Sequence, residues 1–238
     1  MRLLATVIVS VCAVAAALAL PGSGTTATRW DGCTRAPGEL RFRAADGTRL
    51  VGHRFGHSRT VVVLAHESRG SLCDWAPYGR RLARLGLSAF AFDFRNYGQS
   101  QTRAYRNGQA QGADAAAAVR LVRRLGARKV FLVGASLGGS AVISAGAGVR
   151  PPVNGVVSVS GAADLADALG SAGRLRAPVL YLAGRYDVQF AGDAQRLYDA
   201  TRSSDKTLKL LGRGEHGVEL VAGSPSARSL IERFVRSH

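Results

Sequence analysis

The stretch Lys129–Ala141 reads KVFLVGASLGGSA, and the interpretation of the whole chain depends on it. It begins with an apolar run, Val130–Val133, which is typical of a strand buried on both faces of a sheet. The run ends in G-x-S-x-G, with Ser136 between Gly134 and Gly138, and a helix-compatible segment follows. Glycines suit the flanks because side chains there would collide with the neighbouring strand and helix as the turn closes. The pattern indicates a nucleophile elbow, and an ordinary Gly/Ser turn is the alternative for the pentapeptide alone.

The composition is that of a globular protein with one ordinary domain, either alone or behind a targeting segment. Hydrophobic residues make up 47% of the 238 residues and charged residues 20%. The 32 basic residues outnumber the 16 acidic ones, and nearly all of them are arginine. This net charge of +16 is explained either by weak attraction to an anionic envelope surface or by a general composition bias. Since no basic-aromatic array stands out, we expect no nucleic-acid partner.

The N-terminus has the layout of a secretory signal peptide. Residues 1–24 contain one charge, an apolar run over residues 3–20, the cleavage-like triplet Ala17-Leu18-Ala19, and a Pro-Gly break. The alternative is an uncleaved membrane anchor through residues 3–20. Cys12 follows Val11, which does not fit a lipoprotein cleavage site. The sequence therefore predicts a secreted or extracytoplasmic protein.

Residues 25–38 form a polar, turn-rich lead-in that contains Cys33. Once a signal peptide is removed, Cys33 and Cys73 are the two cysteines that remain. An exported pair in an oxidising compartment can form a disulfide, and two unpaired buried thiols are the alternative.

Residues 39–238 alternate strands and helices after an initial hairpin, whose turn contains Asp46-Gly47. This order predicts an α/β fold with a mostly parallel central sheet and an N-terminal antiparallel hairpin. The expected strands are Glu39–Arg43, Arg49–Phe55, Thr60–Ala65, Leu87–Phe92, Val130–Val133, Gly155–Val159, Val179–Ala183 and Thr207–Leu211. The expected helices are Pro77–Leu85, Gly108–Leu125, the segment after the elbow, Asp193–Thr201 and about Ser226–Val235.

A serine hydroxyl needs a base to take its proton, and the base needs an orienting carboxylate. Asp187 follows one late strand and His216 follows the last one, so both are expected at the edge where Ser136 lies. Asp164 is the main rival for the acid, and His66 is the rival for the base, although a structural role for His66 is favoured. We expect His53 to lie at the surface.

The chain resembles the α/β hydrolases over about Glu39–His238. The order Ser136, Asp187, His216 matches that family, and Asp93-x-Arg95-x-x-Gly98-x-Ser100 is similar to its D-x-R-G-x-G-x-S signature. The resemblance implies helices on both faces of the sheet. We expect Asp93 to fix its own loop, with Arg95 as a candidate partner.

The resemblance also implies an oxyanion hole. His66 stands where the family has a His-Gly pair, but Glu67 replaces the glycine. By position, the backbone N–H of Ser68 would supply the first oxyanion donor, with Glu67 as the alternative. The N–H of Leu137 would supply the second.

These features predict an exported serine hydrolase that cleaves carboxylic esters through an acyl-enzyme, with Ser136, Asp187 and His216 as the triad. The α/β hydrolases commonly insert a cap domain between two late strands, where this chain has only nineteen residues, Ser160–Pro178. We therefore expect no separate cap domain and an open, esterase- or lipase-like site. We expect a small-molecule or lipid-like ester substrate, a monomer, no cofactor and no metal. The alternatives are a peptidase or amidase, a non-catalytic binding protein on the same scaffold, and an arginine-rich adhesion protein.

Overall fold

The computed structural model describes Cys33, residues 38–104 and residues 110–238. The predicted signal peptide or anchor (1–24), Cys12 and most of the lead-in (25–38) lie outside these residues, as do the first two residues of the predicted helix Gly108–Leu125. Within the described part, no helix is long and apolar enough to cross a membrane.

The described residues form one eight-stranded sheet in the order β1-β2-β4-β3-β5-β6-β7-β8. The first two strands pair antiparallel, β2 also pairs antiparallel with β4, and the remaining neighbours are parallel. The predicted mostly parallel sheet with an N-terminal hairpin is therefore confirmed. The strands are β1 (Glu39–Arg43), β2 (Arg49–Phe55), β3 (Thr60–Ala65), β4 (Ser88–Phe92), β5 (Lys129–Ala135), β6 (Gly155–Val159), β7 (Val179–Gly184) and β8 (Lys206–Leu211).

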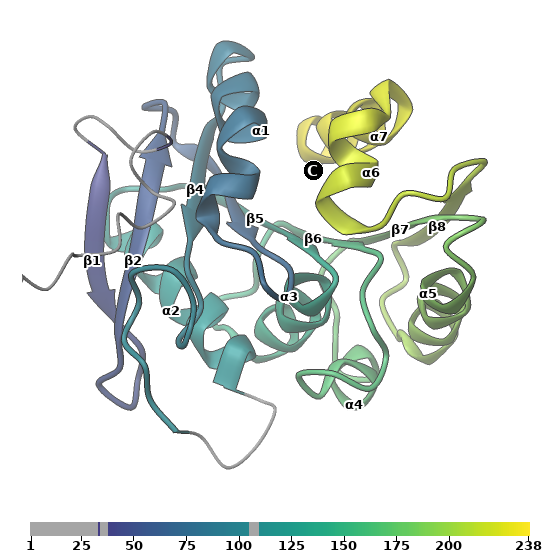
Figure 1. Cartoon of the computed structure of the whole chain (residues 1–238), viewed down its shortest axis with the longest axis horizontal. Helices are drawn as coiled ribbons and strands as arrows, with labels where there is room; N and C mark the ends of the chain where they lie inside the picture. The colour runs from purple at the N-terminus through teal and green to yellow at the C-terminus, as the bar shows by residue number, and fades with distance from the viewer. Residues whose placement is uncertain (1–32, 34–37, 105–109) are drawn as a thin grey trace, which may run out of the picture.

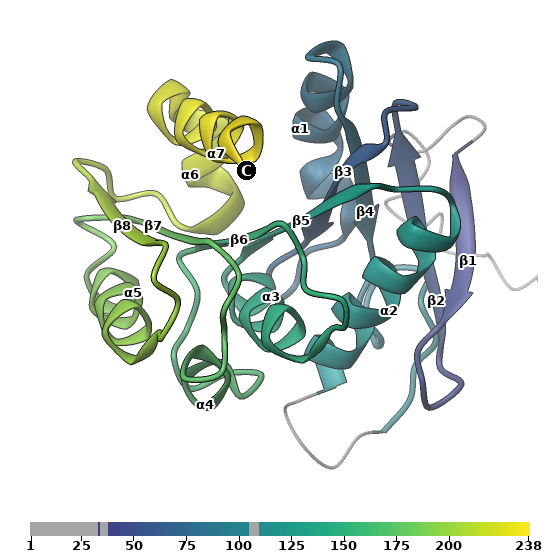
Figure 2. The same cartoon turned by 180° about the vertical axis from the view of Figure 1, so that it is seen from behind.

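Helices cover both faces of the sheet, as predicted (Figures 1 and 2). One face carries α1 (Leu72–Arg84), α6 (Gly217–Gly223) and α7 (Pro225–Ser237), and the other carries α2 (Ala110–Arg124), α3 (Leu137–Gly148), α4 (Ala168–Ala172) and α5 (Val188–Ala200). Because the central strands face helices on both sides, two apolar layers form, one on each face.

The first helix begins earlier than predicted. It starts at Leu72 and not at Pro77, which lies inside the helix. Ser71 caps it: the Ser71 hydroxyl accepts from the N–H of Cys73, and the Asp74 carboxylate accepts from the N–H of Ser71. This capping box supplies partners for N–H groups that the first turn leaves unpaired, so it sets the helix start.

Other element boundaries also differ from expectation. Helix α5 starts at Val188, five residues before the predicted Asp193, and α7 extends to Ser237. Helix α6, Gly217–Gly223, was not predicted. The link between β6 and β7 contains only the five-residue α4, so the described residues hold no cap domain there.

Cys33 and Cys73 are joined by a disulfide, with their Cα atoms 5.5 Å apart. Cys73 lies in the first turn of α1, and not in the loop before that helix as its place in the sequence suggests. The lead-in is thus attached to α1 at this point.

A buried ion-pair network holds the loop after β4. Arg95, only 3% exposed, contacts the Asp114 carboxylate of α2 at 2.6 Å and the Asp46 carboxylate of the hairpin turn at 2.8 Å. The suggested partnership of Asp93 with Arg95 is therefore wrong. Asp93 fixes its loop differently, because its carboxylate accepts from the backbone N–H groups of Leu72 and Gln99.

The expected surface position of His53 is also wrong, since its side chain is only 7% exposed. Its ring is covered by the chain just before β1, where a Cβ atom on Gly38 would lie 2.7 Å from Cε1 of His53, and helix α1 packs on the same strand. The His53 ring lies 4.6 Å from that of Phe55, and burial lowers the pKa of His53.

Candidate active site at the carboxyl edge of the sheet

Ser136 occupies the turn between β5 and α3, with φ 50° and ψ −117°. A non-glycine residue in this region is strained by about 1–3 kcal/mol and needs surrounding structure to hold it. Its N–H donates to the carbonyl of Val159 on β6 at 2.9 Å, and its own carbonyl accepts from the N–H of Ser140. The backbone on both sides of Ser136 is therefore fixed.

The two glycines of the elbow have no room for a side chain. A Cβ atom on Gly134 would overlap the carbonyl of Gly138, and one on Gly138 would overlap the carbonyls of Ala65 and His66. The start of α3 therefore lies directly against the end of β3, and the turn closes only with glycine at both positions.

The structure brings Asp187 and His216 into contact. Asp187 follows β7 and immediately precedes α5, and His216 immediately precedes α6. Nδ1 of His216 lies 2.7 Å from Oδ2 of Asp187, and the Phe190 ring lies 4.1 Å from the imidazole. With its proton on Nδ1, the neutral imidazole keeps Nε2 free to accept a proton.

The loop that carries His216 lies beside the elbow. A Cβ atom on Gly217 would lie 3.5 Å from Cβ of Ala135, the residue before Ser136. Gly217 has φ 54°, and its N–H donates to Oγ of Ser160 at 3.2 Å. The fully buried Ser160 follows β6, so this hydroxyl holds the His216 loop at the sheet edge. Ser160 was not predicted from the sequence, where its position directly after a strand was the available signal.

His66 anchors the loop expected to form the oxyanion hole. It is fully buried, its Nδ1–H donates to the carbonyl of Glu67 at 2.7 Å, and its Nε2 accepts from the N–H of Phe94 at 3.1 Å. Burial lowers the pKa of His66 to about 4, so the ring is neutral at pH 7. With both nitrogens engaged by backbone groups, His66 has the structural role that was favoured over that of a base.

The next residues form a tight turn. The N–H of Gly70 donates to the carbonyl of Glu67 at 3.1 Å, Arg69 has φ 61°, and Ser68 is exposed. The backbone of Ser68 thus lies on the solvent side of the turn that follows His66.

Glu67, where the sequence departs from the His-Gly pair, connects this turn to the His216 loop. Its Oε2 accepts from the N–H of Val218, at the start of α6, at 3.1 Å. Burial raises the pKa of Glu67 above its usual range. Since Val218 lies two residues after His216, one side chain ties the expected oxyanion turn to the segment that carries the imidazole.

Asp164, the rival for the acid, is 75% exposed at its side chain and pairs with Arg196 at 3.1 Å. Among the residues that the structure describes, no group of three or more His, Cys, Asp or Glu side chains could hold a metal ion.

Comparison with protein families gives a match over residues 56–170 to the model described as serine aminopeptidase, S33. The matched segment includes the expected oxyanion turn and the elbow, and it ends before Asp187 and His216. No curated protein matches the chain.

Solved structures are similar over most of the chain. An esterase from Pyrococcus furiosus has a TM-score of 0.72 and 18% identity, with 84% of this chain and 91% of that chain covered. A hydrolase from Pseudomonas aeruginosa has a TM-score of 0.70 and 15% identity, with 84% and 99% covered. An acetyl xylan esterase from Paenibacillus sp. R4 has a TM-score of 0.68 and 16% identity, with 84% and 83% covered.

Proposed function

We propose that the chain, which has the fold of the α/β hydrolases, is a serine hydrolase that cleaves carboxylic esters. One observation carries the proposal. Nδ1 of His216 lies 2.7 Å from the carboxylate of Asp187, and the loop that carries His216 packs beside the strained turn of Ser136. This arrangement provides a nucleophile, a base and an orienting carboxylate at one sheet edge.

In the proposed reaction, Nε2 of His216 takes the proton of Ser136 Oγ as the oxygen attacks the ester carbonyl carbon. Backbone N–H groups of Leu137 and Ser68 (or Glu67) stabilise the oxyanion. The tetrahedral intermediate collapses, the C–O bond to the alcohol breaks, and protonated His216 gives its proton to the departing alcohol. A water molecule, deprotonated by His216, then releases the acid from Ser136. Asp187 orients the imidazole and stabilises its charged form.

Ester substrates are favoured by an open site with apolar side chains near it. The side chains on either side of Asp187 are largely exposed, Tyr186 at 69% and Val188 at 77%. Leu165 and Leu169, on the short link between β6 and β7, are also exposed. Exposed apolar side chains near the proposed catalytic residues can contact the acyl or aryl group of an ester. A closed, polar site for a small metabolite would exclude such a group.

We also propose that the enzyme works outside the cytoplasm as a monomer. Two features support export: the signal-like residues 1–24 and the disulfide between Cys33 and Cys73, since disulfides persist in oxidising compartments. Attraction of the +16 chain to anionic envelope surfaces remains part of this proposal, and a loss of such binding with added salt would support it.

The test compares wild type, Ser136→Ala and Ser68→Ala on p-nitrophenyl esters of increasing acyl length. Ser136→Ala is expected to lose at least about 10⁴-fold in kcat and all labelling by a fluorophosphonate probe. Ser68→Ala keeps its backbone N–H, so its activity should stay within a few-fold of wild type. Unchanged turnover in Ser136→Ala, or no labelling of folded wild type, would contradict the proposal and favour a non-catalytic binding protein.

An amidase or peptidase is the second candidate, because the family model that matches residues 56–170 is described as a serine aminopeptidase. Matched p-nitroanilides on the same variants separate the two. Turnover of anilides at rates comparable to the esters would assign the amide reaction, and selective ester turnover would assign the esterase.

A further inference from the structure

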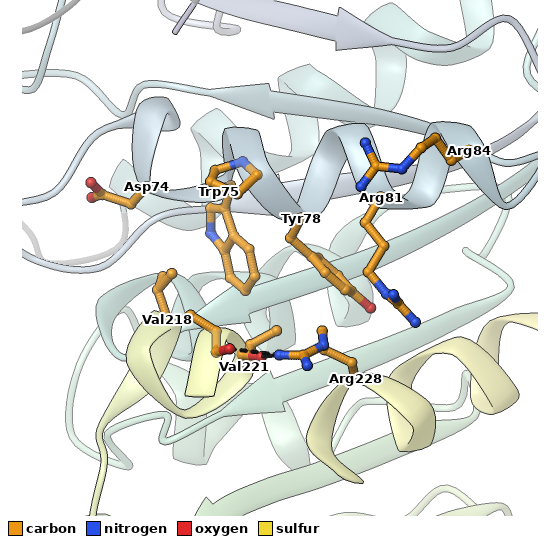
Figure 3. A pocket seen from close by; sticks show the side chains of 10 residues that line it. Asp74, Trp75, Tyr78, Arg81, Arg84, Val218, Val221 and Arg228 are labelled. Atoms are coloured by element: carbon orange, nitrogen blue, oxygen red, sulfur yellow. Dashed lines mark hydrogen bonds between the residues drawn. The ribbon is translucent and has the colours of Figure 1, made fainter. Parts of the chain in front are cut away.

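A cavity of about 360 Å³ lies between α1 on one side and α6 with the start of α7 on the other (Figure 3). Ser136, Asp187 and His216 do not line it. The cavity is therefore a separate feature from the proposed catalytic edge, and its volume is in the range of small-molecule sites.

One part of the cavity wall is apolar and aromatic. Trp75 is fully buried, with its indole N–H donating to the carbonyl of Ala65 at 2.9 Å, so its ring is fixed in place. Val218 and Val221 of α6 face it across the cavity (Figure 3). Trp75 and Val221 are only 0% and 1% exposed and support the wall from behind, so the apolar surface open to a ligand comes from the half-buried Val218 and the exposed Pro77.

Tyr78 brings an unsatisfied donor into this wall. Its side chain is 6% exposed, and its hydroxyl has no hydrogen-bond partner in the structure. In Figure 3 the hydroxyl points into the space between the helices, beside the guanidinium groups of Arg81 and Arg228. Burial raises the pKa of Tyr78, so the hydroxyl keeps its proton and can donate. A buried hydroxyl without a partner is destabilising, and an acceptor on a bound ligand would remove that cost.

Three arginines lie near Tyr78, and the negative carboxylate of Glu232 also acts on its hydroxyl. Arg228 donates through Nη1 to the carbonyls of Val221 and Ala222, at 2.8 and 2.6 Å, and forms no ion pair with any residue that the structure describes. Arg84 is exposed and has no ion pair within the described residues. Arg81 is neutralised by Glu232, whose two carboxylate oxygens both accept from it.

The cavity is polarised along α1. Asp74, its one acidic lining residue, lies at the first turn of the helix and is engaged in the cap of Ser71. Arg81 and Arg84 lie in the last turn. An anionic group is therefore favoured at the arginine end and disfavoured at the other.

We propose that this cavity binds a small amphipathic carboxylate, with its apolar body on Val218 and Pro77 and its carboxylate on the Tyr78 hydroxyl and the Arg228 guanidinium group. Arg84, at the same end of α1, would attract the carboxylate through its charge without contacting it. Binding at this cavity does not require the proposed ester hydrolysis. If that reaction occurs, its acid products belong to the same chemical class as this ligand.

The test is isothermal titration of the full chain carrying Ser136→Ala with 4-phenylbutyrate and with its neutral amide, 4-phenylbutyramide. We expect saturable binding of the carboxylate, with the amide at least about 10-fold weaker. Adding Tyr78→Phe removes only the unpaired oxygen, so the fold is kept and carboxylate affinity should fall about 10-fold. Arg84→Gln should weaken it about 3-fold.

Arg80→Gln is the matched control, because Arg80 is an exposed arginine of the same helix that does not line the cavity. It should change the affinity less than 2-fold. Two results would overturn the proposal: equal affinity for the amide and the carboxylate, or full affinity in Tyr78→Phe and Arg84→Gln. Binding at the Ser136 edge would give the second result, since neither variant touches that edge.

Discussion

Acidification should destabilise the protein through one buried ring, His66. Its Nδ1–H donates to the Glu67 carbonyl, and its Nε2 accepts from the N–H of Phe94. Protonation would place a second proton on Nε2, directed at the N–H that it now accepts from. It would also put a charge in a fully buried site, which is why burial lowers the pKa to about 4 from the ordinary 6.5.

The sign and size follow from the two protonation states. Between pH 6.5 and 4 the unfolded chain binds more protons at His66 than the folded chain does. The contribution of neutral His66 to stability is therefore fully present above pH 6.5 and is lost as the pH falls toward 4. Between pH 7 and pH 4.5 this loss amounts to about 2 kcal/mol in the free energy of unfolding.

Urea denaturation at pH 7 and pH 4.5 measures this loss. In His66→Gln the difference in unfolding free energy between the two pH values should shrink by about 2 kcal/mol, even though the variant is less stable at both. His57→Gln is the control, because it removes an exposed histidine of the same type and should leave the difference as in wild type. An NMR titration of His66 gives its midpoint directly. A midpoint near 6.5, or an unchanged pH difference in His66→Gln, would refute the reasoning.

Three further outcomes are expected. Asp187→Asn should lose about 10⁴-fold in kcat on its best p-nitrophenyl ester, because the imidazole of His216 loses its orienting carboxylate. Circular dichroism and thermal melting should show a normal fold, and a kcat near that of wild type would exclude Asp187 as the orienting residue. Gly138→Ala should destabilise the protein by several kcal/mol in urea titrations, or prevent soluble expression, because the new methyl group overlaps the carbonyl of Ala65; a stable, active variant would contradict the tight turn. Reduction of the Cys33–Cys73 disulfide, which closes a loop of 40 residues, should lower the free energy of unfolding by about 4 kcal/mol, measured with and without dithiothreitol; an unchanged midpoint would show that the bond adds no stability.

The sheet could be predicted from the sequence because its signals are local. Apolar runs such as Val130–Val133 identify strands covered on both faces, and the observed strands differ from the expected ones by at most two residues at an end. Helix starts were harder. Pro77 suggested that the first helix begins there. In the structure α1 begins at Leu72, after a capping box formed by Ser71 and Asp74. Helix α6 is too short to show a clear apolar period.

The candidate site could be predicted in part. The order of Ser136, Asp187 and His216 along the chain, each after a strand of a parallel sheet, predicts all three at one edge, and the structure brings Asp187 and His216 into contact there. The supporting contacts were not accessible. Ser160 binds the N–H of Gly217 across 57 positions of sequence. No local pattern indicates such a bond, because it depends on how separate loops meet.

Two errors have the same physical origin. His53 looked exposed because hairpins often have a solvent-facing side, but Gly38 and helix α1 pack over its strand. Arg95 looked like a partner for Asp93 because the two are neighbours in sequence. In the fold, Arg95 reaches the carboxylates of Asp46 and Asp114 from other elements. In both cases contacts between distant segments decided the environment.

The bond from Glu67 to Val218 couples parts of the molecule that lie 151 residues apart. Replacing Glu67 by glycine, to recreate the more usual His-Gly pair, would remove this hydrogen bond. The start of α6 would then lose a contact that supports the imidazole of His216. Redesign of substrate preference on this scaffold should therefore treat the two loops as a single unit and exchange them together.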